Sequence, residues 1–220
     1  ILACNGEIPF RILKASGYKR LQQLEALRYL HLWEVLQQTV PERHGKPVLL
    51  VVGSYDRKET CMLVSMLAEA FPKAARIEIR LKGHPSCDIV QVLDDLEIDL
   101  HVSGYQVCQG DIAHQLKEAW AVLVATSTVS IEAQAYGSKV LVPFSGGNLC
   151  LAPISGFPDF YHMVTKPEDL RAYVQDLNAS LGENVIEQKR ALVRQYWDLD
   201  PSIPKWIKLI QSKLSCSHVH

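Results

Sequence analysis

The stretch Gly45-Lys46-Pro47-Val48-Leu49-Leu50-Val51-Val52 decides the fold. A turn signal is followed by five apolar residues, with no polar position among them. A strand of this near-continuous apolar character is expected where helices cover both faces of a parallel sheet. Beyond it, short β-branched runs alternate with amphipathic segments of helix length, which predicts repeated βα units.

The sequence therefore predicts an α/β fold: a Rossmann-like, mostly parallel six-stranded sheet with helices on both faces. Strands are expected at Val48–Val52, Arg76–Leu81, Ile98–Val102, Ala121–Ala125, Lys139–Pro143 and Tyr161–Thr165. Helices are expected between them at Lys58–Phe71, Asp88–Leu96, Asp111–Glu118, Val129–Tyr136 and Pro167–Ala179.

Residues 46–182 are assigned to this domain, residues 1–45 to an N-terminal helical segment and residues 183–220 to C-terminal helices. Leucines at helical spacing predict a helix over Ser16–Gln38, and closing helices are expected at Val185–Tyr196 and Ile203–Leu214. The connection Phe144–Phe157, which contains Gly146-Gly147, is expected to be functional because structureless loops of that length are uncommon.

The composition excludes several classes of protein. A formal net charge of −1 over 220 residues gives no bulk electrostatic reason to bind nucleic acid. The six cysteines form no C-x-x-C pair, so neither a zinc knuckle nor a disulfide framework is indicated, and no metal site is expected. The dinucleotide and P-loop fingerprints are absent, so no cofactor is expected. No transmembrane stretch or signal peptide stands out, which predicts a cytoplasmic protein.

Lys82-Gly83-His84-Pro85 follows a predicted strand and is the most specific candidate for a binding loop. Proline keeps the preceding residue out of the helical region, so His84 should be held extended at the strand end. Lys82 and His84 could then contact a phosphate oxygen, while Pro85 presents an apolar edge to a base. The alternative is an ordinary strand end with a solvated Lys82.

Thr126-Ser127-Thr128 lies where another predicted strand meets a helix. Hydroxyls and backbone N–H groups at such a position favour an anion. N-capping accounts for one hydroxyl but not for three in a row. Glu132 should follow on the first turn, where it could accept hydrogen bonds from sugar hydroxyls or serve only as a partner of the helix dipole.

Gly53 and Ser54 follow the first strand of the domain. Glycine would let the backbone approach a ligand, and Ser54 offers a hydroxyl; an ordinary βα turn is the alternative. Because the carboxyl ends of parallel strands meet at one edge, the loops at Lys82–Pro85 and Thr126–Glu132 are expected to face a common crevice.

Together the loops at Lys82–Pro85 and Thr126–Glu132 resemble the C-terminal nucleotide-binding domain of GT-B glycosyltransferases. The likeness covers roughly residues 48 to 180. Within the superfamily, the sequence is most similar to bacterial enzymes that use CMP-activated acidic sugars of the sialic acid and Kdo type. The resemblance implies that His84 acts catalytically by contacting the donor phosphate, that Pro85 borders the cytosine, and that Ser127 and Thr128 bind phosphate. Glu132 resembles the acidic residue that faces the donor ribose in many such proteins.

The resemblance also implies the partners: a nucleotide-sugar donor and a glycan or lipid-linked acceptor of surface polysaccharide synthesis, near the inner membrane. The GT-B enzymes that the sequence resembles consist of two facing Rossmann domains, whereas this chain has room for only one Rossmann domain. A missing N-terminal domain is therefore expected to carry the catalytic base. Two alternatives remain open: a UDP-sugar transferase or epimerase, and a non-catalytic nucleotide-sugar binding or assembly module.

Overall fold

The computed structural model describes residues 1–40, 42–74, 76–144, 150–175, 177 and 182–216. The chain divides into two compact units: Val40–Ile186 forms one, and Ile1–Thr39 together with Glu187–His220 forms the other. Each is described by itself. Within the described ranges, no helix combines the length and the apolar character needed to cross a membrane.

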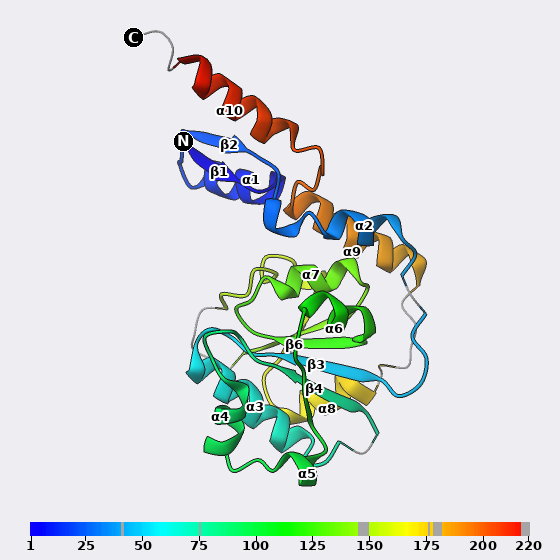
Figure 1. The fold of residues 1–220 in the computed structure, drawn as a ribbon. Helices are drawn as coiled ribbons and strands as arrows, with labels where there is room; N and C mark the ends of the chain where they lie inside the picture. Colours follow the sequence, from blue (N-terminus) through cyan, green and yellow to red (C-terminus); the bar gives the residue numbers. More distant parts are fainter. Residues whose placement is uncertain (41, 75, 145–149, 176, 178–181, 217–220) are drawn as a thin grey trace. The chain divides into compact units, whose positions relative to one another are not determined.

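The unit Val40–Ile186 is built on one six-stranded sheet in which every pairing is parallel (Figure 1). The strands are β3 (Val48–Val52), β4 (Glu78–Lys82), β5 (Gln106–Val107), β6 (Ala121–Val124), β7 (Lys139–Pro143) and β8 (His162–Val164). Their spatial order is β5-β4-β3-β6-β7-β8. In order of appearance this is 3-2-1-4-5-6, the order of a doubly wound Rossmann sheet. The predicted fold class is confirmed.

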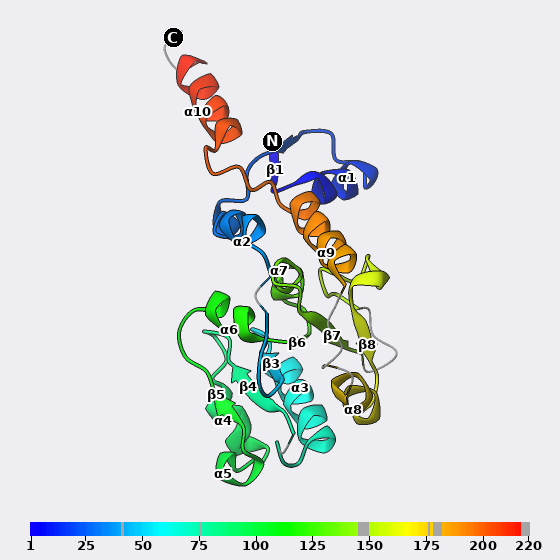
Figure 2. The same ribbon diagram turned by 90° about the vertical axis from the view of Figure 1, so that its right-hand side faces the viewer.

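Helices cover both faces of this sheet. They are α3 (Arg57–Ala70), α4 (Ile89–Asp95), α5 (Leu100–Ser103), α6 (Ile112–Glu118), α7 (Val129–Ala135) and α8 (Pro167–Gln175), with a short 3₁₀ helix, η2 (Pro158–Phe160). Helix α3 packs with α4 and α8 on one face, while α6 and α7 lie on the other (Figures 1 and 2). Four of these helices begin at an aspartate whose carboxylate accepts a hydrogen bond from the N–H two residues further on. The capping residues are Asp56, Asp88, Asp99 and Asp111.

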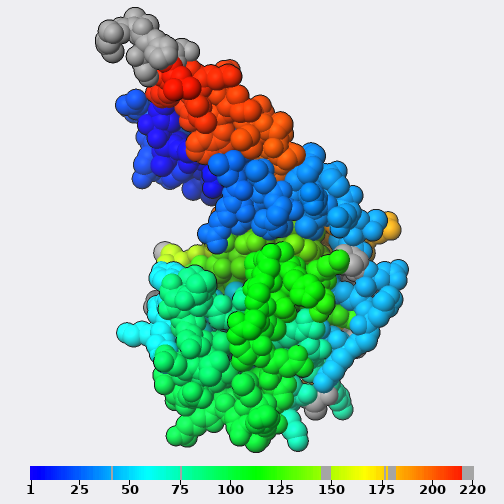
Figure 3. Space-filling view, in the orientation of Figure 1, coloured from blue at the N-terminus to red at the C-terminus, as the bar shows by residue number. Residues whose placement is uncertain are grey.

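The hydrophobic core lies against β3, whose five residues are all buried, as the apolar run predicts. Leucines of α3 and residues of the neighbouring strands complete it on one face, among them Leu63, Leu67, Ile79, Leu81 and Leu123. Helices and loops close over these strands and give the unit the continuous surface seen in the space-filling view (Figure 3).

One predicted strand is wrong. The segment Ile98–Val102 is not in the sheet, because Leu100–Ser103 forms α5. The strand that follows β4 in the chain is Gln106–Val107. The carboxylate of Asp99 accepts hydrogen bonds from the N–H groups of His101 and Val102, and Gly104 ends the helix with a φ of 71°. An aspartate cap and a left-handed glycine therefore outweigh the β-branched residues of the segment.

The other unit combines the first 39 residues with the C-terminal helices. Its elements are β1 (Leu2–Cys4), α1 (Glu7–Ala15), β2 (Leu21–Gln23), the 3₁₀ helix η1 (Leu27–Tyr29), α2 (Leu32–Gln37), α9 (Glu183–Tyr196, entered from the preceding unit) and α10 (Pro204–Cys216). Strands β1 and β2 form a two-stranded parallel sheet. Tyr29 stacks on Trp197 with 3.9 Å between ring centroids.

The predicted helix over Ser16–Gln38 is wrong, because this stretch contains a strand and two short helices. Gly17 adopts a φ of 89°, which ends α1 at this point. Of the leucines that suggest a helix, Leu24 is buried in a loop and Leu32 and Leu36 are buried on α2, whereas Leu27 is half exposed. Their helical spacing reflects burial at several places rather than one helical face.

Candidate functional site

Three loops meet the carboxyl edge of the sheet at its centre. Strand β3 pairs with β4 on one side and with β6 on the other. The chain runs from β3 to β4 and β5 on one side, and then crosses to β6, β7 and β8 on the other. The crevice beyond such a switch point is where ligands bind in open α/β sheets. The loops beginning at Gly53, Gly83 and Ala125 all leave the sheet here.

The loop after β3 is shaped mainly by packing. A Cβ atom on Gly53 would lie 3.2 Å from Cγ2 of Thr60, so glycine allows α3 to approach the strand closely. The N–H of Ser54 donates to Oγ1 of Thr60 at 3.0 Å, and the Ser54 hydroxyl accepts from the N–H of Asp56 at 3.2 Å. Both predicted residues are buried, and Ser54 uses its hydroxyl within the turn.

The loop after β4 fixes an imidazole. Nδ1 of His84 accepts a hydrogen bond from the N–H of Ser86 at 3.1 Å, and the N–H of Cys87 donates to the carbonyl of His84 at 2.9 Å. In the neutral ring with Nδ1 as acceptor, the proton is on Nε2, which can donate to a ligand. Pro85 is exposed beside it. The ring of Tyr55, from the loop after β3, meets His84 edge to face with 6.4 Å between centroids.

Gly83 and Lys82 complete this loop. A Cβ on Gly83 would lie 3.1 Å from Cβ of Ile89, so the glycine is needed for the strand end to pass the first turn of α4. Lys82 is half-buried, and among the described residues no carboxylate lies within ion-pair distance of its ammonium group. Its charge is available to an anion.

The loop after β6 carries the predicted hydroxyls. Oγ1 of Thr126 donates to a carboxylate oxygen of Glu59 on α3 at 2.6 Å. The hydroxyl of Ser127 accepts from the N–H of Val129 at 3.3 Å, so it caps the start of α7. Oγ1 of Thr128 lies 3.5 Å from Oε1 of Glu132. Each hydroxyl therefore has a different contact.

Glu132 is only 5% exposed. Burial raises the pKa of Tyr136 to about 12, and the negative charges of Glu132 and Asp111 add to this shift.

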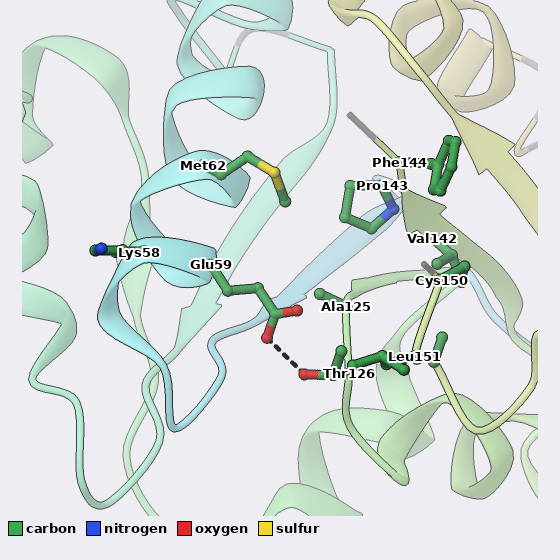
Figure 4. A pocket seen from close by; sticks show the side chains of 11 residues that line it. Lys58, Glu59, Met62, Ala125, Thr126, Val142, Pro143, Phe144, Cys150 and Leu151 are labelled. Atoms are coloured by element: carbon green, nitrogen blue, oxygen red, sulfur yellow. Dashed lines mark hydrogen bonds between the residues drawn. The ribbon is translucent and has the colours of Figure 1, made fainter. Parts of the chain in front are cut away.

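Among the described residues, one pocket at this edge lies beside the loop after β6 and another beside the loop after β4. The first, of about 300 Å³, lies between α3 and the ends of β6 and β7 and includes Glu59 and Thr126 (Figure 4). The second, of about 190 Å³, is lined by residues 82–85, the start of α4 and residues 107–109. They share no lining residue, and whether the loops at Lys82–Pro85 and Thr126–Thr128 face one common crevice stays a prediction. Because β3 separates β4 from β6, their ends lie two strand spacings apart, about 10 Å.

Glu59, Cys108 and Gln109 are among the lining residues that were not predicted from the sequence. The last two line the second pocket because β5 begins eight residues later than predicted. Glu59 carried a misleading signal, since an acidic residue three positions after the capping aspartate is typical of a capping box. In the predicted connection Phe144–Phe157, Phe144 and residues 150–152 line the first pocket, whereas Gly146-Gly147 lies outside the described residues.

Comparison with known proteins identifies the fold. No protein-family model and no curated protein sequence matches the chain. Among solved structures, the wall teichoic acid polymerase TagF (H548A) is similar over 100% of this chain and 59% of its own, with 12% identity and a TM-score of 0.51. TarM is similar over 94% and 42%, with 10% identity and a TM-score of 0.54. The calicheamicin glycosyltransferase CalG4 is similar over 99% and 52%, with 18% identity and a TM-score of 0.57.

The fold is that of GT-B glycosyltransferases. At these identities the likeness concerns the fold alone. The chain spans 59% of TagF, 42% of TarM and 52% of CalG4.

Proposed function

We propose that this protein binds a nucleotide-activated sugar at the carboxyl edge of its parallel sheet and takes part in glycosyl transfer. The observation that carries the proposal is the switch point at β3. The loop on one side of it carries a histidine and a lysine, and the loop on the other side carries a row of hydroxyls. Ligands of open α/β sheets bind at this position. The likeness to GT-B structures supports the same class of ligand.

His84 and Lys82 are proposed to hold the donor phosphate. Nε2–H of His84 and the available ammonium group of Lys82 are the donors that an anion needs, and Nδ1 is already occupied by Ser86. In a direct displacement at the anomeric carbon, charge builds up on the leaving phosphate. Fixed donors stabilise that charge without a covalent intermediate.

The base of the nucleotide is proposed to be a pyrimidine. A CMP-linked donor follows from the resemblance of the two motifs, with Pro85 bordering the cytosine. Among the similar structures, TagF (H444N) is described with CDPG, and a mutant of S. aureus TarM is described in complex with UDP. These descriptions support nucleotide binding and leave CMP, CDP and UDP donors to be separated by measurement.

The acceptor is proposed to be a surface carbohydrate or a lipid-linked glycan, handled in the cytoplasm at the inner membrane. The catalytic base is proposed to belong to a further N-terminal domain. The chain's shorter span relative to TagF, TarM and CalG4 supports this division of labour.

The test compares His84→Asn with wild type. The asparagine Oδ1 can take over the hydrogen bond from Ser86 N–H, so the turn is kept while the Nε2 donor is lost. Losing one hydrogen bond to a charged phosphate should weaken nucleotide binding roughly ten- to hundredfold. Titration calorimetry with CMP, CDP, UMP and UDP measures this loss.

His101→Ala provides the matched control, since His101 is an exposed histidine on α5 of the same unit and should leave every affinity unchanged. If His84→Asn binds all four nucleotides as tightly as wild type does, His84 has no role in phosphate binding. Nucleotide binding without turnover in the full protein would favour the non-catalytic module instead.

A further inference from the structure

The first pocket at the carboxyl edge has a distinct chemistry. Its walls are largely apolar and come from α3, the end of β7 and the segment at residues 150–152, with Met62, Pro143, Phe144 and Leu151 among them. Glu59 and Thr126 meet at its edge and face one another in the close view (Figure 4). A mainly apolar pocket with a few fixed polar groups is typical of a small-molecule site.

Glu59 points to this pocket because its usual partner is taken. In a capping box, the acidic residue at the third helical position accepts a hydrogen bond from the N–H of the capping residue. Here that N–H, on Asp56, donates to the hydroxyl of Ser54 at 3.2 Å. Oε2 of Glu59 accepts from Thr126 instead, at 2.6 Å.

The charge of Glu59 is not neutralised locally. Among the residues that the structure describes, no cationic side chain lies within ion-pair distance of its carboxylate. Arg57 pairs with Asp95. Lys58 also lines the pocket, but its side chain points away from the place where Glu59 meets Thr126 (Figure 4). The pocket therefore presents a half-buried negative charge beside apolar walls, where screening by water is weaker than at an open surface.

The size of the pocket limits its occupant. At about 300 Å³ it lies at the lower end of small-molecule sites. This favours a single ring or a short polyol over a whole nucleotide. The phosphate-binding candidates Lys82 and His84 line the other pocket, so the two pockets suit two parts of one donor.

We infer that the pocket at Glu59 receives the transferred group of the donor, and that this group is neutral and rich in hydroxyls rather than acidic. The inference rests on the proposed function. Hydroxyls of the group donate to the free lone pairs of the Glu59 carboxylate, and its C–H faces pack against the apolar walls. A sugar carboxylate would be repelled, which argues against the sialic acid and Kdo type of donor implied by the motif resemblance.

The experiment uses a pair of ligands that differ at one carbon. UDP-glucose and UDP-glucuronate are titrated calorimetrically, with UDP alone as the reference, into wild type, Glu59→Gln and Glu69→Gln. Glu69 is a carboxylate on the same helix, outside the lining of the pocket, and serves as the matched control. Wild type should prefer UDP-glucose to UDP-glucuronate by about tenfold or more, because like charges repel in a partly buried site.

In Glu59→Gln that preference should shrink at least about fivefold, while UDP binds as it does to wild type and Glu69→Gln retains the full preference. Equal affinities of wild type for the two sugar nucleotides, or an unchanged preference in Glu59→Gln, would overturn the inference while leaving nucleotide binding intact. If CMP binds and UDP does not, CDP-glucose and CDP-glucuronate replace the pair in the same three proteins. Failure of every nucleotide to bind would overturn the proposed function as well.

Discussion

A single buried hydroxyl fixes the first loop of the site. Oγ1 of Thr60 accepts from the N–H of Ser54 at 3.0 Å and lies 3.1 Å from the carbonyls of Ser54 and Asp56, to which it can donate. Thr60 is fully buried, so no water can replace these bonds. The same turn uses the Asp56 N–H for Ser54 and so releases Glu59 toward Thr126.

We expect Thr60→Val to destabilise the unit Val40–Ile186 by about 1–3 kcal/mol, because valine keeps the shape but leaves the buried N–H of Ser54 without an acceptor. Urea unfolding monitored by circular dichroism measures the change. Thr60→Ser is the control, since it keeps the hydroxyl and should cost less. A valine variant as stable as wild type would show that this bond does not hold the loop.

Individual residues differ in how far the sequence predicts them. His84 could be placed because a following proline and a preceding strand restrict its backbone, and the structure puts it at the strand end as expected. Gly53 and Gly83 lie at strand ends as expected and make room for Thr60 and Ile89, while their part in ligand binding stays a prediction. Glu59 could not be predicted, because its direction depends on a contact with Thr126, 67 residues away.

At the scale of elements, three of the four aspartate-capped helices and the strands with continuous apolar residues can be predicted to within a few residues, whereas α5 is wrongly predicted as a strand. The failures occur where a local cap or burial in the tertiary structure outweighs the hydrophobic pattern. Residues 98–102 combine β-branched side chains with an aspartate cap and a terminal glycine, and the cap decides. Residues 16–38 show helical spacing, but their buried positions belong to a loop and two short helices, and the strand between them is only partly buried.

Glu25 shows how one side chain can position a helix that is distant in sequence. It is 1% exposed, and its two carboxylate oxygens accept hydrogen bonds from the N–H groups of Lys205 and Trp206 at 2.8 and 3.1 Å, in the first turn of α10. The indole N–H of Trp206 also donates to the Glu25 carbonyl at 2.9 Å. The carboxylate replaces the cap that the sequence before Pro204 does not supply.

We expect Glu25→Gln to weaken the docking of α10 by about 1–2 kcal/mol, since an amide has one acceptor oxygen for two N–H groups. Faster hydrogen exchange at the amides of residues 205 and 206 is the direct readout. Glu34→Gln, at an exposed carboxylate of the same unit, should leave these exchange rates unchanged. Unchanged protection in Glu25→Gln would show that α10 is held by its apolar contacts alone.

At the scale of the molecule, the order of the strands determines where the candidate binding loops lie. The alternation of strands and helices predicted a parallel sheet, but it could not tell which strands are neighbours. The structure places β3 at the centre, with the predicted phosphate loop on one side and the hydroxyl loop on the other. The two loops line different pockets at this edge, which suggests a division of the donor between them.

The most direct test of nucleotide binding at this edge is a crystal structure of the protein soaked with CMP or UDP at millimolar concentration. Our account predicts a phosphate within hydrogen-bond distance of Nε2 of His84, and a nucleotide lying over the ends of β3 and β4. A nucleotide bound elsewhere on the molecule, or an edge left empty at saturating ligand, would contradict it.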